Sequence, residues 1–181
     1  MKNKKGFTLI ELLAVIVVLA VIMVIATQQV NGVMAKARSN SFIESYQMVV
    51  KQGKSCAAQD DNPSYREAAT GVTAITSQCN YDLSKDYKLV VLCGDNMGST
   101  EVNAIKTATV KSSINAADYC HVTLTATTED GSKFKNMDLL TYGNGAASSG
   151  ADCAKKIGSG AIKCTDDGDN KGKEIQGYFE M

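Results

Sequence analysis

The sequence predicts an α+β protein in which one long N-terminal helix packs against an antiparallel β-sheet head. Residues 7–26 form an apolar run with a single charge, and helical periodicity continues beyond it to about residue 58. Residues 59–181 are polar and rich in Gly, Ser, Thr and Asn, with short runs that alternate as β-strands do. A chain of 181 residues can hold one domain and an appendage.

The apolar run predicts a membrane-spanning helix. As a helix, residues 7–26 would be ~30 Å long, which is the thickness of the hydrocarbon core of a bilayer. Lys2, Lys4 and Lys5 precede the run, and basic flanks stay in the cytoplasm. The head is therefore expected outside the cytoplasm.

Two simpler interpretations of this segment leave something unexplained. A cleaved secretory signal would use a small-residue site such as Val24-Ile25-Ala26, although the apolar run is long for one. A plain membrane anchor does not explain Glu11, because a carboxylate inside a spanning helix costs at least ~2.5 kcal/mol. In that interpretation Glu11 would reach the lipid headgroups.

The stretch Lys5-Gly6-Phe7-Thr8-Leu9-Ile10-Glu11 resembles the class III leader junction of type IV pilins. The resemblance covers about the first 35 residues. It implies that a prepilin peptidase removes the basic leader, residues 1–6, between Gly6 and Phe7, and that Phe7 is then N-methylated. It also implies a pilin fold. Many pilins carry a proline midway along this helix, whereas the only proline here is Pro63.

The resemblance gives Glu11 a role in assembly. Cleavage would create an α-amine at Phe7, which is largely cationic at neutral pH. Within one helix the amine and Glu11 are four positions apart and could neutralise each other. Between subunits, the same pair would set the axial register, because a misaligned neighbour would leave a buried charge unpaired.

Residues 27–58 are predicted to continue the helix as an amphipathic segment. One face carries Phe42, Tyr46, Val49, Val50 and Gly53, whereas charged residues lie largely away from it. The alternative is two helices separated at Asn31-Gly32, because glycine costs ~1 kcal/mol relative to alanine inside a helix.

The head, residues 59–181, is predicted to be an antiparallel meander. Strands are expected at residues 87–93, 119–127 and 173–179, with a turn at residues 94–98. A hairpin turn at residues 129–132 would lead into a further strand at 133–137, and residues 65–69 suggest a helical turn.

The six cysteines all follow the apolar run, which in an exported domain indicates disulfides. Cys153 and Cys164 are predicted to form a local bond, and Cys56 and Cys79 a bond between the helix end and the connecting loop. Cys93 and Cys120 are the remaining candidates. The alternative is free buried thiols, and the sequence does not choose among the 15 pairings.

No catalytic arrangement stands out, so we predict that the protein is not an enzyme. The only histidine, His121, points away from the strand face that carries Cys120, and we expect no metal or cofactor. Asp166, Asp167 and Asp169 resemble a calcium loop in composition only, and a solvated turn is the favoured interpretation. The net charge is zero, and −3 without the leader, so a nucleic-acid partner is not expected.

The sequence therefore predicts a structural subunit of a type IV pilus that serves adhesion, surface motility or aggregation. Its partners would be copies of itself and other pilins, the prepilin peptidase, and the membrane before assembly. It would be a single-pass membrane protein first and part of an extracellular pilus later. The alternatives are a pseudopilin of a type II secretion or DNA-uptake system, or an exported binding domain released by a signal peptidase. Major and minor subunits are not distinguished.

Overall fold

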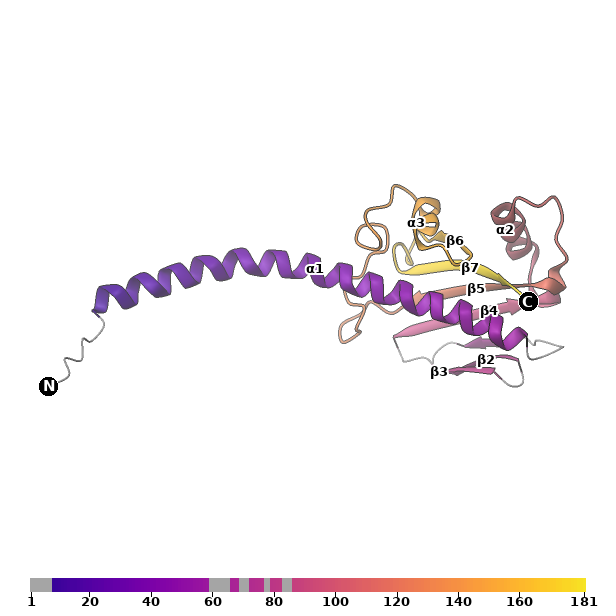
Figure 1. The fold of residues 1–181 in the computed structure, drawn as a ribbon, viewed down its shortest axis with the longest axis horizontal. Helices are drawn as coiled ribbons and strands as arrows, with labels where there is room; N and C mark the ends of the chain where they lie inside the picture. The colour runs from indigo at the N-terminus through magenta and orange to yellow at the C-terminus, as the bar shows by residue number, and fades with distance from the viewer. Residues whose placement is uncertain (1–7, 59–65, 69–71, 77–78, 83–85) are drawn as a thin grey trace. The chain divides into compact units, whose positions relative to one another are not determined.

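The computed structural model describes residues 8–58, 66–68, 72–76, 79–82 and 86–181 (Figure 1). For residues 27–29, 66–68, 72–76 and 79–82 it describes the backbone only. The chain divides into two compact units, residues 1–34 and residues 35–181, which are described separately below.

Helix α1 extends from Leu9 to Ala57 and is continuous through Asn31 and Gly32. The alternative of two separate helices is therefore wrong. A single glycine costs about 1 kcal/mol, and the surrounding residues, mostly good helix formers, continue the hydrogen-bond ladder across it. A Cβ at Gly32 would meet no atom within 4 Å, so no close packing requires this glycine.

The second unit, residues 35–181, holds the later part of α1 together with the predicted head and is called the head from here on. It is built on a five-stranded antiparallel sheet of order β1-β4-β5-β7-β6. Its strands, in chain order, are β1 (Arg66–Ala68), β4 (Tyr87–Cys93), β5 (Tyr119–Ala126), β6 (Ala161–Cys164) and β7 (Glu174–Glu180). A separate hairpin pairs β2 (Val72–Thr76) with β3 (Cys79–Asp82). The fold is α+β with a long N-terminal helix against an antiparallel sheet, as predicted.

Three strands are confirmed within a residue of their predicted bounds, namely β4, β5 and β7. The simple meander is wrong, because β7 lies between β5 and β6 in the sheet. The helical turn predicted at residues 65–69 is also wrong over its described part. Arg66–Ala68 instead pairs with β4, which satisfies its backbone groups at the sheet edge.

The predicted strand at residues 133–137 is wrong as well. The turn before it is present, with the Ser132 N–H donating to the Glu129 carbonyl at 3.1 Å, but the chain continues in further turns. Asn136 has a φ of +59°, which a strand does not accommodate. Phe134 and Met137 are buried in the core, so the apolar residues of this segment pack from a loop and not from a strand.

The main core lies between α1 and one face of the sheet. Phe42, Tyr46, Val49 and Val50 of α1 are buried as predicted, against alternate residues of β4, β5 and β7. The ring of Phe42 stacks on Tyr87 with centroids 5.9 Å apart, and both meet the edge of Phe134. This aromatic cluster fixes the loop after β5 against the helix.

Two further helices cover other parts of the sheet (Figure 1). Helix α2 (Ser99–Thr109) follows the short 3-10 helix η1 (Gly94–Asn96) and packs Ile105 against Tyr119 on the face opposite α1. A second 3-10 helix, η2 (Ala116–Asp118), leads into β5. Helix α3 (Gly150–Ile157) packs beside α1, whose Gln47 side chain donates to the Ile157 carbonyl at 3.1 Å.

Candidate functional site

The first part of α1 is an apolar helix with exposed side chains. Every described side chain from Thr8 to Ala26 is exposed, including Leu12 at 63%. Among the described residues this is the one helix that is long and apolar enough to cross a membrane. An apolar surface of this extent requires either lipid or other apolar helices around it.

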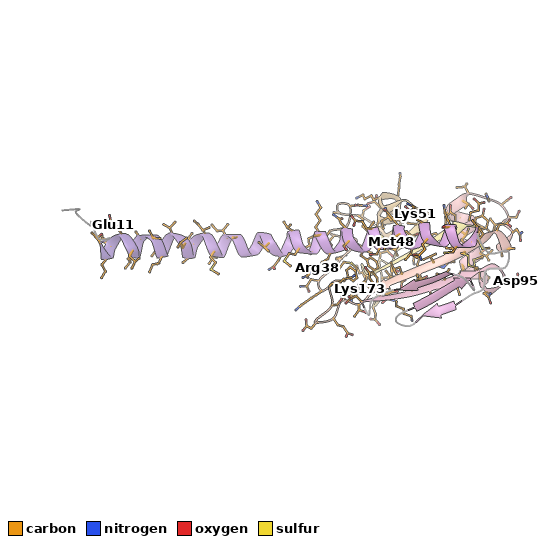
Figure 2. The ribbon with its side chains drawn as sticks, turned by 60° about the horizontal axis from the view of Figure 1, so that its bottom comes forward. Glu11, Arg38, Met48, Lys51, Asp95 and Lys173 are labelled. Carbon is orange, nitrogen blue, oxygen red and sulfur yellow. A yellow bond between two sulfur atoms is a disulfide. The ribbon has the colours of Figure 1, made fainter. Side chains whose placement is uncertain are left out.

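Glu11 is the only charged residue between residues 6 and 36, and it lies in the first turn of α1 (Figure 2). Its Oε2 accepts hydrogen bonds from the backbone N–H of Thr8 at 2.8 Å and from the Thr8 hydroxyl at 2.9 Å. The Glu11 N–H in turn donates to the Thr8 hydroxyl oxygen at 3.3 Å. Thr8 and Glu11 therefore form a reciprocal capping box.

Sequence reasoning missed this role of Thr8, although the signal was present as the pattern Thr-x-x-Glu before an apolar run. Both bonds to the carboxylate end on Oε2. Within the described part of the chain, Oε1 accepts no hydrogen bond. One oxygen of the only charged group in the apolar helix is thus available to another donor. Gly6 and Phe7 lie outside the described residues, so the cleavage site and the predicted Phe7–Glu11 pair stay predictions.

Comparison with known families gives one match, to the "Prokaryotic N-terminal methylation motif", over residues 1–27. A motif of this kind is the N-terminal signature of type IV pilins and pseudopilins, and residues 1–27 are the part of the chain that carries the likeness. Proteins of this family are structural and not enzymes. No curated protein and no solved structure matches the chain. The α+β head on a long helix is a pilin-like fold.

The head is held by disulfides. Cys153 of α3 is bonded to Cys164 of β6, the local pair expected from the spacing, and Cys93 is bonded to Cys120 across β4 and β5. Cys56 is also disulfide-bonded. The predicted bond from Cys56 to Cys79 involves a side chain outside the described ones. No described cysteine is a free thiol.

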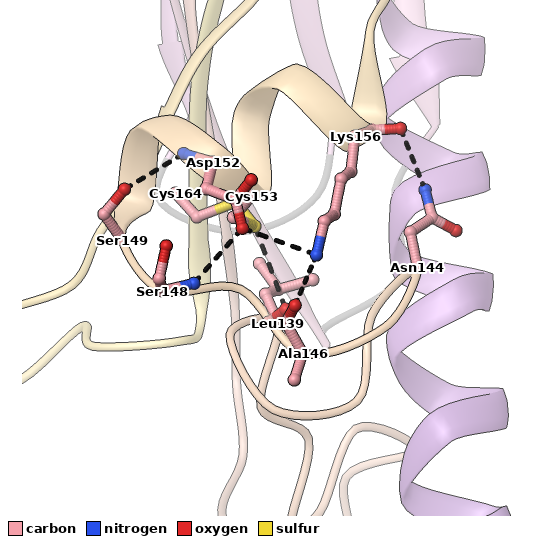
Figure 3. A network of polar contacts seen from close by, with 9 residues as sticks. All are labelled: Leu139, Asn144, Ala146, Ser148, Ser149, Asp152, Cys153, Lys156 and Cys164. Atoms are coloured by element: carbon pink, nitrogen blue, oxygen red, sulfur yellow. Dashed lines mark hydrogen bonds and ion pairs between the residues drawn. A yellow bond between two sulfur atoms is a disulfide. The ribbon is translucent and has the colours of Figure 1, made fainter.

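The Cys153–Cys164 bond fixes a helix that carries its own caps (Figure 3). The Ser149 hydroxyl accepts from the Asp152 N–H at 3.1 Å, and Asp152 accepts from the Ser148 N–H at 3.2 Å. The bond from Ser148 is the main reason that the pKa of Asp152 is lowered. Lys156 lies 3.4 Å from the same carboxylate and donates to the Ala146 carbonyl, which fastens the preceding loop to α3.

The acidic loop near the C-terminus carries three aspartates, which do not cluster around one point among the described residues. Asp166, Asp167 and Asp169 are exposed, and the Gly150 N–H donates to Asp166 at 2.7 Å, which lowers the pKa of Asp166. In the described part of the chain, no three His, Cys, Asp or Glu side chains are placed to hold a metal ion. The structure therefore gives no support to the calcium alternative.

His121 is on the sheet face opposite Cys120, as the alternation predicted, but it is buried at 5% exposure rather than pointing to solvent. On β5 it lies between Leu92 of β4 and Tyr178 of β7, residues that pack against the cluster under α2. Burial lowers the pKa of His121, and the nearby carboxylates of Glu101 and Glu174 only partly oppose this. The histidine is a core residue in this fold.

Proposed function

We propose that the chain is a subunit of a type IV pilus, made as a membrane-stored prepilin and assembled after its leader is removed. The methylation motif over residues 1–27 is the observation that carries the proposal. Peptidase cleavage between Gly6 and Phe7, on the cytoplasmic side, would leave Phe7 as the new N-terminus. The disulfide-bonded head is consistent with a location outside the cytoplasm.

In the assembled filament, the apolar helices of residues 7–26 pack together away from water, and the heads face solvent. The Phe7 amine of one subunit pairs with Glu11 of a neighbour. The available Oε1 of Glu11 supports this, because Thr8 occupies only the other oxygen. A subunit with the wrong stagger would bury an unpaired carboxylate, which costs about 3–5 kcal/mol. The charge therefore selects one register.

The first test is the N-terminus of the mature protein. Mass spectrometry of the purified chain should find N-methylated Phe7 as the first residue. A mature chain that begins at Thr27 would mean removal by a signal peptidase and would overturn the proposal in favour of an exported binding domain.

The second test separates the charge of Glu11 from its capping role. Glu11→Gln keeps an oxygen that can accept from Thr8 but removes the charge, whereas Glu11→Ala removes both. Both variants should insert and be cleaved normally, and both should lose filaments by at least about tenfold, as judged by electron microscopy of sheared surface material. Filaments of wild-type yield from Glu11→Gln would refute the charge pair.

Adhesion, surface motility and aggregation are the activities that such a filament serves. A pseudopilin of a secretion or DNA-uptake system is the alternative within the same family. Imaging distinguishes the two, because a pilus subunit would be abundant in long surface filaments. If the chain is processed at Phe7 but never found in such filaments, the pseudopilin alternative is correct.

A further inference from the structure

An exposed valine in the head has an unusual backbone conformation. Val110 ends helix α2 with φ 57° and ψ 33°, in the left-handed region that glycine or asparagine usually occupies at a helix end. Its side chain is 91% exposed, the most exposed of the large apolar side chains described. A β-branched residue in this conformation is a rare outlier, and a side chain this exposed buries little against the described part of the head to offset the strain.

Val110 lies in a basic surface depression. The depression is lined by Asn103, Lys106, Thr107, Val110, Lys111 and Ser112. Lys111 is already engaged, because it donates to the Tyr119 hydroxyl at 2.6 Å and lies 3.8 Å from Glu180. Lys106 forms no ion pair with any residue that the structure describes. The depression therefore offers an apolar contact beside an available positive charge.

A complementary surface lies on α1, within the same head unit. Met48 is 61% exposed on the side of the helix turned away from the sheet, as its position opposite Tyr46 and Val50 requires. Glu44 is exposed one turn before Met48 on the same stripe. Lys51 follows Met48 along α1 (Figure 2). Glu44 also forms no ion pair among the described residues.

We infer that the depression around Val110 binds the Glu44–Met48 stripe of a second copy of this chain. Met48 would then contact Val110 while Glu44 pairs with Lys106. Two features favour this occupant over a different protein. Glu44 and Lys106 carry opposite charges. Each lies beside an exposed apolar side chain and forms no ion pair with a residue that the structure describes.

The placement of the two surfaces predicts how copies connect. Helix α1 packs on one face of the sheet, with residues such as Val122, and α2 packs on the other, with residues such as Tyr119. The two surfaces thus lie on opposite sides of the head. Each copy would use its Val110 surface toward one neighbour and its Met48 surface toward another, and such a heterologous contact propagates. The inference rests on the proposed function, since it describes a head-to-head contact within the filament.

Cysteine cross-linking tests the contact directly. Cells making Val110→Cys/Met48→Cys should give a ladder of disulfide-linked multimers in sheared filaments after mild oxidation. Each single variant should give no ladder, because a heterologous contact brings Val110 near Met48 and not near another Val110. Filaments of normal yield without a ladder would overturn the inference and leave the proposed function intact. Absence of filaments from the wild-type chain would instead refute the proposed function.

Charge reversal provides a test that does not depend on new thiols. Lys106→Glu and Glu44→Lys should each lower filament yield by at least about tenfold, because like charges would then meet across the contact. The double variant Lys106→Glu/Glu44→Lys should restore most of the yield. Lys155→Glu, on α3, is the matched control and should assemble normally. Failure of the double variant to exceed the single variants would overturn the inference, provided that thermal melting shows all heads folded.

Discussion

At the scale of single residues, Glu11 has one contact in the structure and one in the proposed assembly. Its Oε2 completes the capping box with Thr8, which stabilises the start of α1, and its Oε1 accepts no hydrogen bond from a residue that the structure describes. The cap restrains the carboxylate in one rotamer at the helix start. A pre-positioned acceptor loses less entropy when the amine of a neighbour binds, so the cap would favour the proposed charge pair rather than compete with it.

Gly177 is a second residue whose identity follows from its close contacts. A Cβ there would lie 1.7 Å from the Tyr46 hydroxyl oxygen and 2.8 Å from the Gly160 carbonyl oxygen, so only glycine allows the ring of Tyr46 and the chain next to β6 to approach β7 this closely. We predict that Gly177→Ala lowers the free energy of unfolding by about 1–3 kcal/mol, because the tyrosine must move out of a packed core.

The measurement is denaturant unfolding of the detergent-solubilised chain, followed by near-UV circular dichroism. Tyr46→Phe alone should have a small effect, since the hydroxyl donates only one long bond, at 3.4 Å, to the Ser159 carbonyl. Adding Tyr46→Phe to Gly177→Ala should recover part of the loss. Strictly additive losses in the double variant would show that the two positions do not compete for space.

At the scale of elements, the sequence predicted what local periodicity encodes. β4 was predictable because it alternates buried and less buried residues over its seven positions. The sequence of β5 also alternates apolar and polar residues from Cys120 to Ala126, although its first four residues are all buried in the structure. α1 was predictable from its apolar run and from the apolar face of Phe42, Tyr46 and Val49 that follows it. α2 and α3 were missed, because they are short and polar and bury only a few residues against the sheet.

The order of the strands in the sheet could not be predicted from the sequence, for a different reason. Among the described strands, β6 pairs with β7, and β7 also pairs with β5. The last strand of the chain therefore lies inside the sheet, between β5 and β6, and not at its edge. The alternation of residues within a strand does not indicate which other strand it will pair with. The burial of His121 has the same origin, because alternation places it on a face but does not say that α2 covers that face.

The disulfides are the element-scale feature with the clearest energetic consequence. Cys153–Cys164 closes a separation of 11 residues and Cys93–Cys120 one of 27. By the loop-entropy relation, replacing each pair with alanine should cost about 3 and about 3.5 kcal/mol respectively. Urea unfolding of the two double-alanine variants measures both losses. An unchanged unfolding midpoint for either variant would show that its bond does not stabilise the fold.

At the scale of the whole molecule, the stability of the head should depend on pH through its only histidine. Burial under α2 lowers the pKa of His121, and Glu101 of α2 and Glu174 of β7 are the charged groups that counteract the shift. The unfolded chain therefore binds a proton at a higher pH, near about 6.5, than the folded one. Stability is complete above that pH and falls as the pH decreases through the lower folded-state pKa.

We predict that the melting temperature of the full-length chain falls between pH 7.5 and pH 5 and that His121→Phe removes much of this fall. The carboxylates Asp152 and Asp166, whose pKa values are lowered, lose their contribution only below about pH 4, so they do not contribute in this window. Melting curves of both proteins at matched ionic strength provide the measurement. Because phenylalanine also changes the packing, the comparison is of slopes and not of absolute values. Parallel pH profiles would mean that His121 does not titrate differently in the folded head and would contradict its burial as a neutral side chain.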